Sequence, residues 1–200
     1  MRGYQCTGQD FTPERVDISR KRAARFKVSV EVGQGDAAKL GYAGEFDAVL
    51  ALNVLFLLPS DEDAKTCIAG AYRALKPGGV LVCNIFNALD AGRSEARRLT
   101  NNDHIVSEAR GRGIRITAIE KLKDYDPVQG VGWVHTTSIV EAPDGRHVFR
   151  DRERVRFFTY WDITRFTSQA GFKETSYYPD WKSKPAKKST ADEIVFIARK

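Results

Sequence analysis

The chain has 200 residues, of which 42% are hydrophobic and 29% charged, and its formal net charge is +6. A chain of this length can bury a core without disulfides or metal ions, so we expect one domain over residues 1–200. It contains no apolar run of bilayer length, no signal-peptide stretch and no metal or disulfide spacing among its three cysteines, which predicts a cytoplasmic protein without a membrane span.

The positive charge is spread over several segments instead of being concentrated in one tract. Basic residues occur around positions 20–25, 110–115 and 182–188. Such a distribution is typical of solvated surfaces, and it argues against a nucleic-acid partner. Binding of an anionic small-molecule substrate is the alternative explanation for these basic residues.

The first half of the chain alternates between strand and helix patterns. Thr12 and Pro13 form a helix start, Ser60 with Asp63 forms another, and the run 46–52 is almost continuously apolar, as in a strand that is buried on both faces. We expect strands at 4–10, 28–32, 46–52 and 80–85 and helices at 13–26, 61–75 and 88–99. This order predicts an α/β domain with a mostly parallel sheet.

The second half changes character. Alternating stretches at 114–122, 132–141 and 147–158 predict an antiparallel insertion over residues 112–158, with a hairpin turn at 143–145. Thr159 and Asp162 then cap a helix that Gly171 closes, and a strand pair at 172–178 and 193–198 completes residues 159–200.

Four local patterns resemble, in order, the class I S-adenosylmethionine-dependent methyltransferase family. They are GQDFTPE at 8–14, GDAAKL at 35–40, EFDAVLALNVL at 45–55 and RALKPGGVL at 73–81. The resemblance implies a Rossmann-like, doubly wound sheet that binds S-adenosyl-L-methionine through residues 4–99, with residues 112–158 on the substrate side. It also implies methyl transfer to an O, N or C nucleophile of a small molecule.

The resemblance assigns five cofactor-binding residues: Asp10, Phe11, Asp36, Ala37 and Asn53. In the family, the acid matched by Asp10 accepts hydrogen bonds from both ribose hydroxyls, and the residue matched by Phe11 packs on the adenine. Asp36 and Ala37 match the positions that bind the adenine amine and a ring nitrogen. Asn53 matches a contact to cofactor or substrate, and the alternative is an Asn that caps the end of its strand.

The chain departs from the family at its start. The family begins with a central strand and a G-x-G-x-G turn that holds the amino-acid part of the cofactor, and residues 1–3 do not match them. We therefore expect a sheet that lacks this strand between the strands ending at Asp10 and Leu52. Three alternatives remain: a fragment of an ordinary methyltransferase that lacks its N-terminal segment, a degenerate relative that no longer catalyses, and a chain that rearranges its sheet or borrows a strand from a partner.

The acceptor is not identified by the sequence, and no catalytic base is assigned. Residues 52–55 lack the Asn-Pro-Pro-aromatic string that grips a flipped base, which favours a small-molecule acceptor. A nucleotide-dependent dehydrogenase and a non-catalytic interaction or regulatory module are the rival functions. Candidate proton acceptors are His104, His135, Tyr160 and Tyr178, and candidate pocket-wall aromatics are Trp133, Tyr160, Trp161 and Trp181, with packing roles as the alternative in each case.

Overall fold

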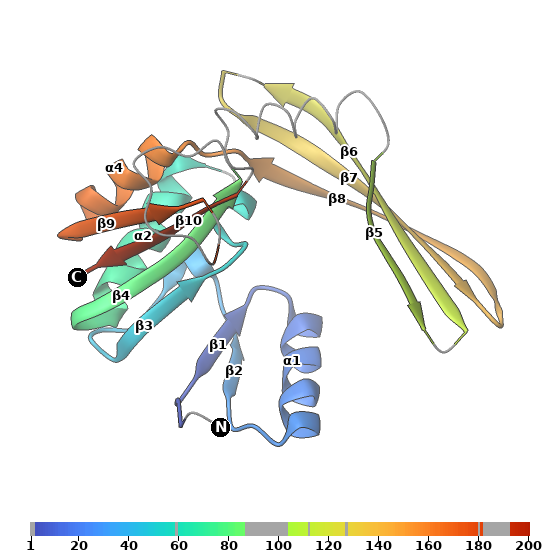
Figure 1. The fold of residues 1–200 in the computed structure, drawn as a ribbon, viewed down its shortest axis with the longest axis horizontal. Helices are drawn as coiled ribbons and strands as arrows, with labels where there is room; N and C mark the ends of the chain where they lie inside the picture. Colours follow the sequence, from blue (N-terminus) through green and yellow to red (C-terminus); the bar gives the residue numbers. More distant parts are fainter. Residues whose placement is uncertain are drawn as a thin grey trace.

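The strands of the described chain form three sheets (Figure 1). The computed structural model describes residues 3–58, 60–86, 104–111, 113–126, 128–179, 181 and 193–200. A parallel pair is formed by β1 (Thr7–Asp10) and β2 (Glu31–Gln34). The second sheet has the order β3-β4-β10-β9, from β3 (Phe46–Ala51), β4 (Leu75–Phe86), β10 (Glu193–Arg199) and β9 (Glu174–Tyr178). The third is antiparallel, β5-β6-β7-β8, from β5 (His104–Gly111), β6 (Ile114–Asp126), β7 (Val131–Ala142) and β8 (Gly145–Arg156).

The predicted helix starts after Thr12, Ser60 and Thr159 are confirmed, but the Thr12 hydroxyl, which was expected to cap its helix, forms no cap hydrogen bond. The Ser60 hydroxyl accepts a hydrogen bond from the Asp63 amide, and Thr159 with Asp162 forms a complete capping box. Gly171 ends the last helix in the left-handed conformation. The helices are α1 (Pro13–Phe26), η1 (Ala37–Lys39), η2 (Leu55–Leu57), α2 (Asp61–Ala74) and α4 (Tyr160–Ala170).

Several predicted boundaries differ from the structure. β2 begins at Glu31 instead of residue 28, and β4 begins at Leu75, so the Lys-Pro-Gly-Gly string lies within a strand and not in a separate turn. Leu75 pairs with Phe46 of β3, and the register is irregular between this pair and the next, Ala48 with Val80. The Gly79 carbonyl accepts from the Lys200 amide in this irregular part. The antiparallel sheet gains β5, which the sequence analysis did not assign. The helix expected at 88–99 lies outside the described residues.

One face of the β3-β4-β10-β9 sheet carries the main core. Helices α2 and α4 pack on it, and fully buried side chains from both helices and the sheet interlock there, including Ile68, Leu81, Phe166 and Phe196. Because the alternate residues of β3 point to opposite faces, Val49 and Ala51 join this core while Leu50 points away from it. Among the described residues, no helix is long and apolar enough to cross a membrane.

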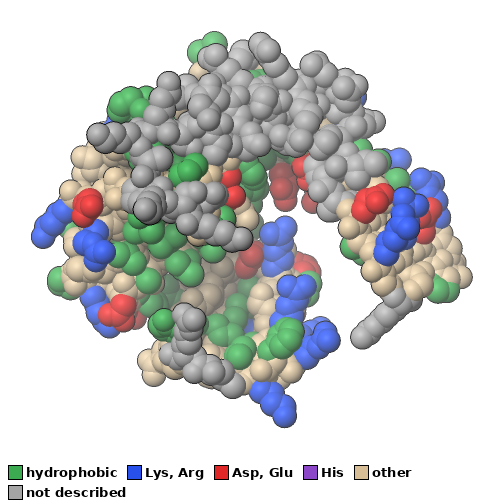
Figure 2. All heavy atoms as spheres, in the orientation of Figure 1, with side chains coloured by type: hydrophobic (Ala, Val, Ile, Leu, Met, Phe, Trp, Pro, Cys, Tyr) green, Lys and Arg blue, Asp and Glu red, His purple; other side chains and the backbone are tan. Residues whose placement is uncertain are grey.

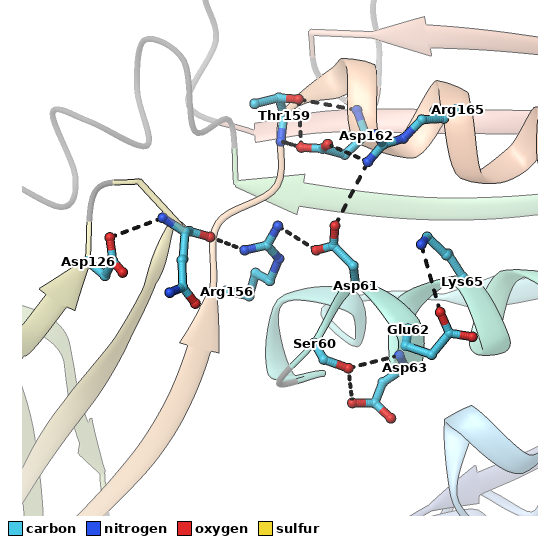
Figure 3. A network of polar contacts seen from close by, with 11 residues as sticks. Ser60, Asp61, Glu62, Asp63, Lys65, Asp126, Arg156, Thr159, Asp162 and Arg165 are labelled. Carbon is cyan, nitrogen blue, oxygen red and sulfur yellow. Dashed lines mark hydrogen bonds and ion pairs between the residues drawn. The ribbon is translucent and has the colours of Figure 1, made fainter.

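The antiparallel sheet is joined to this body at one end only, and its strands extend away from it (Figure 1). A small second core of Leu122, Val155 and Phe157 packs against Phe56 of η2 and Phe86 at the end of β4. Figure 3 shows a polar link beside this core. Arg156 at the end of β8 pairs with Asp61 of α2 at 2.5 Å and also donates to the Gln129 carbonyl.

β1 and β3 each have one edge that pairs with no strand in the described ranges. Gln9 of β1 reaches the segment before β3 through a hydrogen bond of 2.9 Å to the Tyr42 hydroxyl. Apolar side chains near these edges are exposed, with Leu50 at 64% and Phe11 at 74%. The unit of β1, β2 and α1 is also separated from the antiparallel sheet by open space in Figure 2.

Candidate functional site

Asp10 lies at the carboxyl end of β1 and opens a tight turn. Its Oδ1 accepts from the Thr12 amide at 2.9 Å, which fixes the carboxylate at the start of α1. Phe11 follows with a largely exposed ring. A carboxylate with a free acceptor oxygen beside an exposed aromatic ring is suited to a ligand that has hydroxyls and a flat apolar group.

Asp36 lies in the adjacent turn, after β2. Its Oδ1 caps η1 by accepting from the Ala38 amide at 2.9 Å, and its Oδ2 lies 3.6 Å from Lys39 Nζ. The Gly35 amide donates to the Asp10 carbonyl at 3.0 Å, so the two turns are linked. Because β1 and β2 are parallel, with Asp10 opposite Gln34, the two acids emerge at the same carboxyl edge. Ala37, partly buried, packs against the main core and anchors this turn.

Asn53 lies at the carboxyl end of β3 in a left-handed conformation, with φ of 54°. Its amide donates to Asn84 Oδ1 and its own Oδ1 accepts from Asn84 Nδ2, both at 2.7 Å. Asn84 Nδ2 also donates to Glu193 Oε1 at 2.7 Å. The Asn84 residue is buried, so these bonds fix the end of β3 and place a carboxylate beside Asn53.

Sequence reasoning missed Asn84 and Glu193. Asn84 is the one polar side chain in the apolar run 80–85, and a buried amide of this kind needs partners. That signal was available from the sequence. Glu193 had no local signal, because its role depends on β10 pairing antiparallel with β4 so that Glu193 lies opposite Phe86.

The described residues fit the adenosine part of the cofactor that the resemblance implies. Asp10 provides an acceptor for a diol, Phe11 an exposed ring for a base, and Asp36 an acceptor whose turn also presents backbone N–H groups. In the described residues no strand pairs with both β1 and β3, so the strand and glycine-rich turn that hold the amino-acid part of the cofactor in the family have no counterpart there.

The candidate aromatic wall is only partly assembled. Tyr160 contacts Trp161 and Tyr177, with ring centroids 4.4 Å and 5.4 Å away, at the start of α4. Trp133 lies instead on the antiparallel sheet beneath Arg152. Trp181 is exposed, and in the described chain its ring contacts none of the other three candidate aromatic residues.

The candidate proton acceptors are dispersed. Partial burial raises the pKa of Tyr160, and Tyr177 adds to this effect, which makes Tyr160 a poorer base at neutral pH. His135 lies in the middle of β7, opposite Lys121 and Arg152, and Tyr178 ends β9 opposite Val195. His104 begins β5, where its side chain is outside the described atoms. No general base is assigned by this arrangement.

Comparison with known proteins finds a partial match to one family. Residues 1–83 match the profile of the family described as "Methyltransferase domain". Demethylmenaquinone methyltransferase of Deinococcus radiodurans is 34% identical over 79 residues, which are 39% of this chain and 32% of that protein. The chain spans about a third of the length of the curated relatives that it matches.

Solved structures match over nearly the whole chain. An S-adenosylmethionine-dependent methyltransferase from Clostridium acetobutylicum has a TM-score of 0.77 at 14% identity, covering 98% of this chain and 75% of its own. The CcbJ methyltransferase from Streptomyces caelestis has a TM-score of 0.74 at 22% identity, with the same coverage. The expected Rossmann-like α/β fold is confirmed by these structures, and residues 1–83 are similar to the methyltransferase domain.

Proposed function

We propose that the chain forms most of an S-adenosylmethionine-dependent methyltransferase that acts on a small-molecule O, N or C nucleophile. The observation that carries the proposal is the pair of linked turns that holds Asp10 and Asp36 at one carboxyl edge. The curated relative named above is a demethylmenaquinone methyltransferase, so its substrate is a small molecule. That name supports the acceptor class only.

In this proposal each of the five predicted residues has a distinct task. Asp10 accepts from the ribose hydroxyls while Phe11 covers one face of the adenine. Asp36 accepts from the adenine amine, and the Ala37 amide donates to the ring. Asn53, fixed by Asn84, lines the methionine end. The bound cofactor supplies an electrophilic methyl group, and these residues contribute by orienting it toward the acceptor in a site that excludes water.

We further propose that a parallel strand between β1 and β3 completes the sheet. Both facing edges are unpaired in the described chain, and Leu50 on β3 is 64% exposed although its strand neighbours Val49 and Ala51 join the core. A strand added there would pair with the backbone N–H and C=O groups along both edges. The proposal is the same whether this strand comes from a partner or from a further segment of the protein.

The test is calorimetric titration of S-adenosylhomocysteine into the chain and its Asp10→Ala and Asp36→Ala variants. We expect saturable binding that both substitutions abolish. Asp17→Ala is the matched control, because this exposed acid lies on α1 and pairs only with Arg20 among its described neighbours. Equal binding by wild type and both site variants would refute the assignment of the adenosine site.

A second experiment separates the cofactor site from the proposed missing strand. Hydrogen exchange of β1 and β3 amides reports on their open edges directly. We expect fast exchange along β3 relative to β4 in the isolated chain, and protection once the completing strand is present. Slow exchange along both open edges in the isolated chain would contradict the proposed strand.

A further inference from the structure

The arginines of β8 lie on one face of the antiparallel sheet. Arg150, Arg152, Arg154 and Arg156 alternate with Asp151, Glu153 and Val155. Because successive strand residues point to opposite faces, all four guanidinium groups share a face, with neighbours about 6.8 Å apart along the strand. The residues from Gly145 to Arg154 are exposed, so the row is open to solvent.

The register of the sheet adds two lysines, a histidine and a tryptophan to the same face. Lys121 and His135 lie in the row of Arg152, and Lys123 and Trp133 lie in the row of Arg154. The Arg152 Cζ atom lies over the Trp133 ring, 5.2 Å from its centroid, which places the two side chains on one face. We define the basic face by six residues: Lys121, Lys123, Trp133, Arg150, Arg152 and Arg154.

The rows of the sheet that contain Arg150, Arg152 and Arg154 include no carboxylate. Glu120, Asp151 and Glu153 occupy the alternate positions and therefore belong to the opposite face. At the far end Arg115 is paired with Glu108 and Glu141, and at the near end Arg156 is paired with Asp61. Asp124 and Asp126, at the end of β6, line a hollow together with Trp133 and Arg154, so carboxylates border the basic face at this end. Within the described chain Arg150 and Arg154 form no ion pair, so the charges of these two arginines are not neutralised by a neighbouring carboxylate.

Two simpler roles account for less of this pattern. Charges protect an edge strand from aggregation whatever their sign, so protection does not require all the arginines to lie on one face. Antiparallel pairing of β8 with β8 of a second copy around Arg152 would place Arg150 opposite Arg154, where like charges destabilise the pair. An extended anionic ligand that lies over the face would explain why the arginines lie on one side of the sheet.

We propose that the basic face binds single-stranded nucleic acid. Arginine binds phosphate through two parallel N–H donors, and a row with regular spacing can follow a phosphate backbone. Trp133 with the guanidinium of Arg152 provides a flat surface for a base, and this combination of a basic track and a stacking surface is the usual design for single strands. The nucleic acid is a bound partner here, and the methyl acceptor proposed above stays a small molecule.

The test is fluorescence anisotropy with a labelled 12-nucleotide single strand of mixed sequence, as RNA and as DNA, between 50 and 300 mM salt. The variant is Arg150→Gln/Arg152→Gln/Arg154→Gln. We expect at least about tenfold weaker binding, and a slope of log K against log salt that is smaller by about 2, since each lost phosphate contact removes about 0.7. Trp133→Leu should weaken binding about fivefold or more with the slope unchanged.

The matched control is Arg15→Gln/Lys21→Gln/Arg22→Gln, which removes the same charge from the exposed residues of α1. Circular dichroism verifies that both variants fold. The proposal is overturned by an equal loss in the control, by the absence of wild-type binding at 50 mM salt, or by tighter binding of polyglutamate than of the oligonucleotide. Because no cofactor is added, the result is independent of the proposed methyl transfer.

Discussion

Asn84 holds Asn53 in a left-handed backbone conformation through two hydrogen bonds of 2.7 Å between the buried amide side chain and the end of β3. The same side chain donates to Glu193 at the start of β10. One side chain on β4 therefore connects the carboxyl end of β3 with the first residue of β10. This connection determines the geometry of the predicted methionine end of the site.

Replacing Asn84 by Leu should destabilise the fold and loosen this end. The change removes three hydrogen bonds and leaves their partners unsatisfied, which costs about 1–3 kcal/mol of the free energy of unfolding. Urea denaturation measures this, and hydrogen exchange at the Asn53 amide should accelerate. Asn53→Gly retains the bond from that amide to Asn84 and suits the positive φ, so it should change stability by less than about 1 kcal/mol. A stable Asn84→Leu protein with a protected Asn53 amide would contradict the assignment.

Cutting the Arg156–Asp61 pair should release the antiparallel sheet from α2. The Arg156 side chain is only 15% exposed, and its guanidinium also lies over Phe158 at 5.0 Å. A double-mutant cycle with Arg156→Met and Asp61→Asn should show a coupling of about 0.5–3 kcal/mol. Arg154→Met is the control on the same strand, and it should show no coupling to Asp61→Asn. Zero coupling for Arg156 as well would mean that the apolar contacts alone attach the sheet.

The buried cysteines predict a loss of stability at alkaline pH. Burial raises the pKa of the Cys67 thiol from 9.0 to about 11, with a smaller contribution from Asp36, and burial raises that of Cys83 to about 12. A raised folded-state pKa contributes stability that is complete below the unfolded pKa and is lost as pH rises toward the folded value. The free energy of unfolding should therefore fall between about pH 9 and 12, by up to about 2.7 kcal/mol per pH unit for two thiols.

Urea denaturation at pH 8 and pH 10 of the wild type and a Cys67→Ala/Cys83→Ala variant tests this. The free energy of unfolding of the double variant should differ less between the two pH values than that of the wild type.

In thiol labelling of the native protein at pH 8, exposed Cys6 should react while the two buried cysteines stay protected. If the free energy of unfolding falls equally between pH 8 and pH 10 with and without the buried thiols, groups other than these cysteines cause the fall.

Gly130→Ala should destabilise more than Gly44→Ala. The two glycines have nearly the same φ, 68° and 67°, so the backbone strain of a side chain is matched. An added Cβ at Gly130 would lie 2.8 Å from the Phe157 carbonyl oxygen, whereas at Gly44 it would meet nothing within 4 Å. The excess loss at Gly130 should be about 1–3 kcal/mol, measured by thermal denaturation. Equal losses would show that the loop before β7 moves away without cost.

The sequence determined the features that depend on neighbouring residues. The helix starts at Ser60 and Thr159, the end at Gly171, and the apolar run of β3 follow from capping chemistry and periodicity within a few residues. The predicted site residues Asp10 and Asp36 also lie in local turns, where each carboxylate accepts from an amide two residues on. The roles of these acids in cofactor binding remain predictions.

Only the tertiary structure decided what depends on strand pairing. The start of β4 before the Lys-Pro-Gly-Gly string depends on the pairing of Leu75 with Phe46 of β3, and the contact of Asn84 with Glu193 spans 109 positions. The charge looked dispersed along the sequence, yet the register of β6, β7 and β8 places Lys123, Trp133 and Arg154 in one row. Pairing partners are chosen by burial and hydrogen bonding between distant segments, and no local pattern encodes that choice.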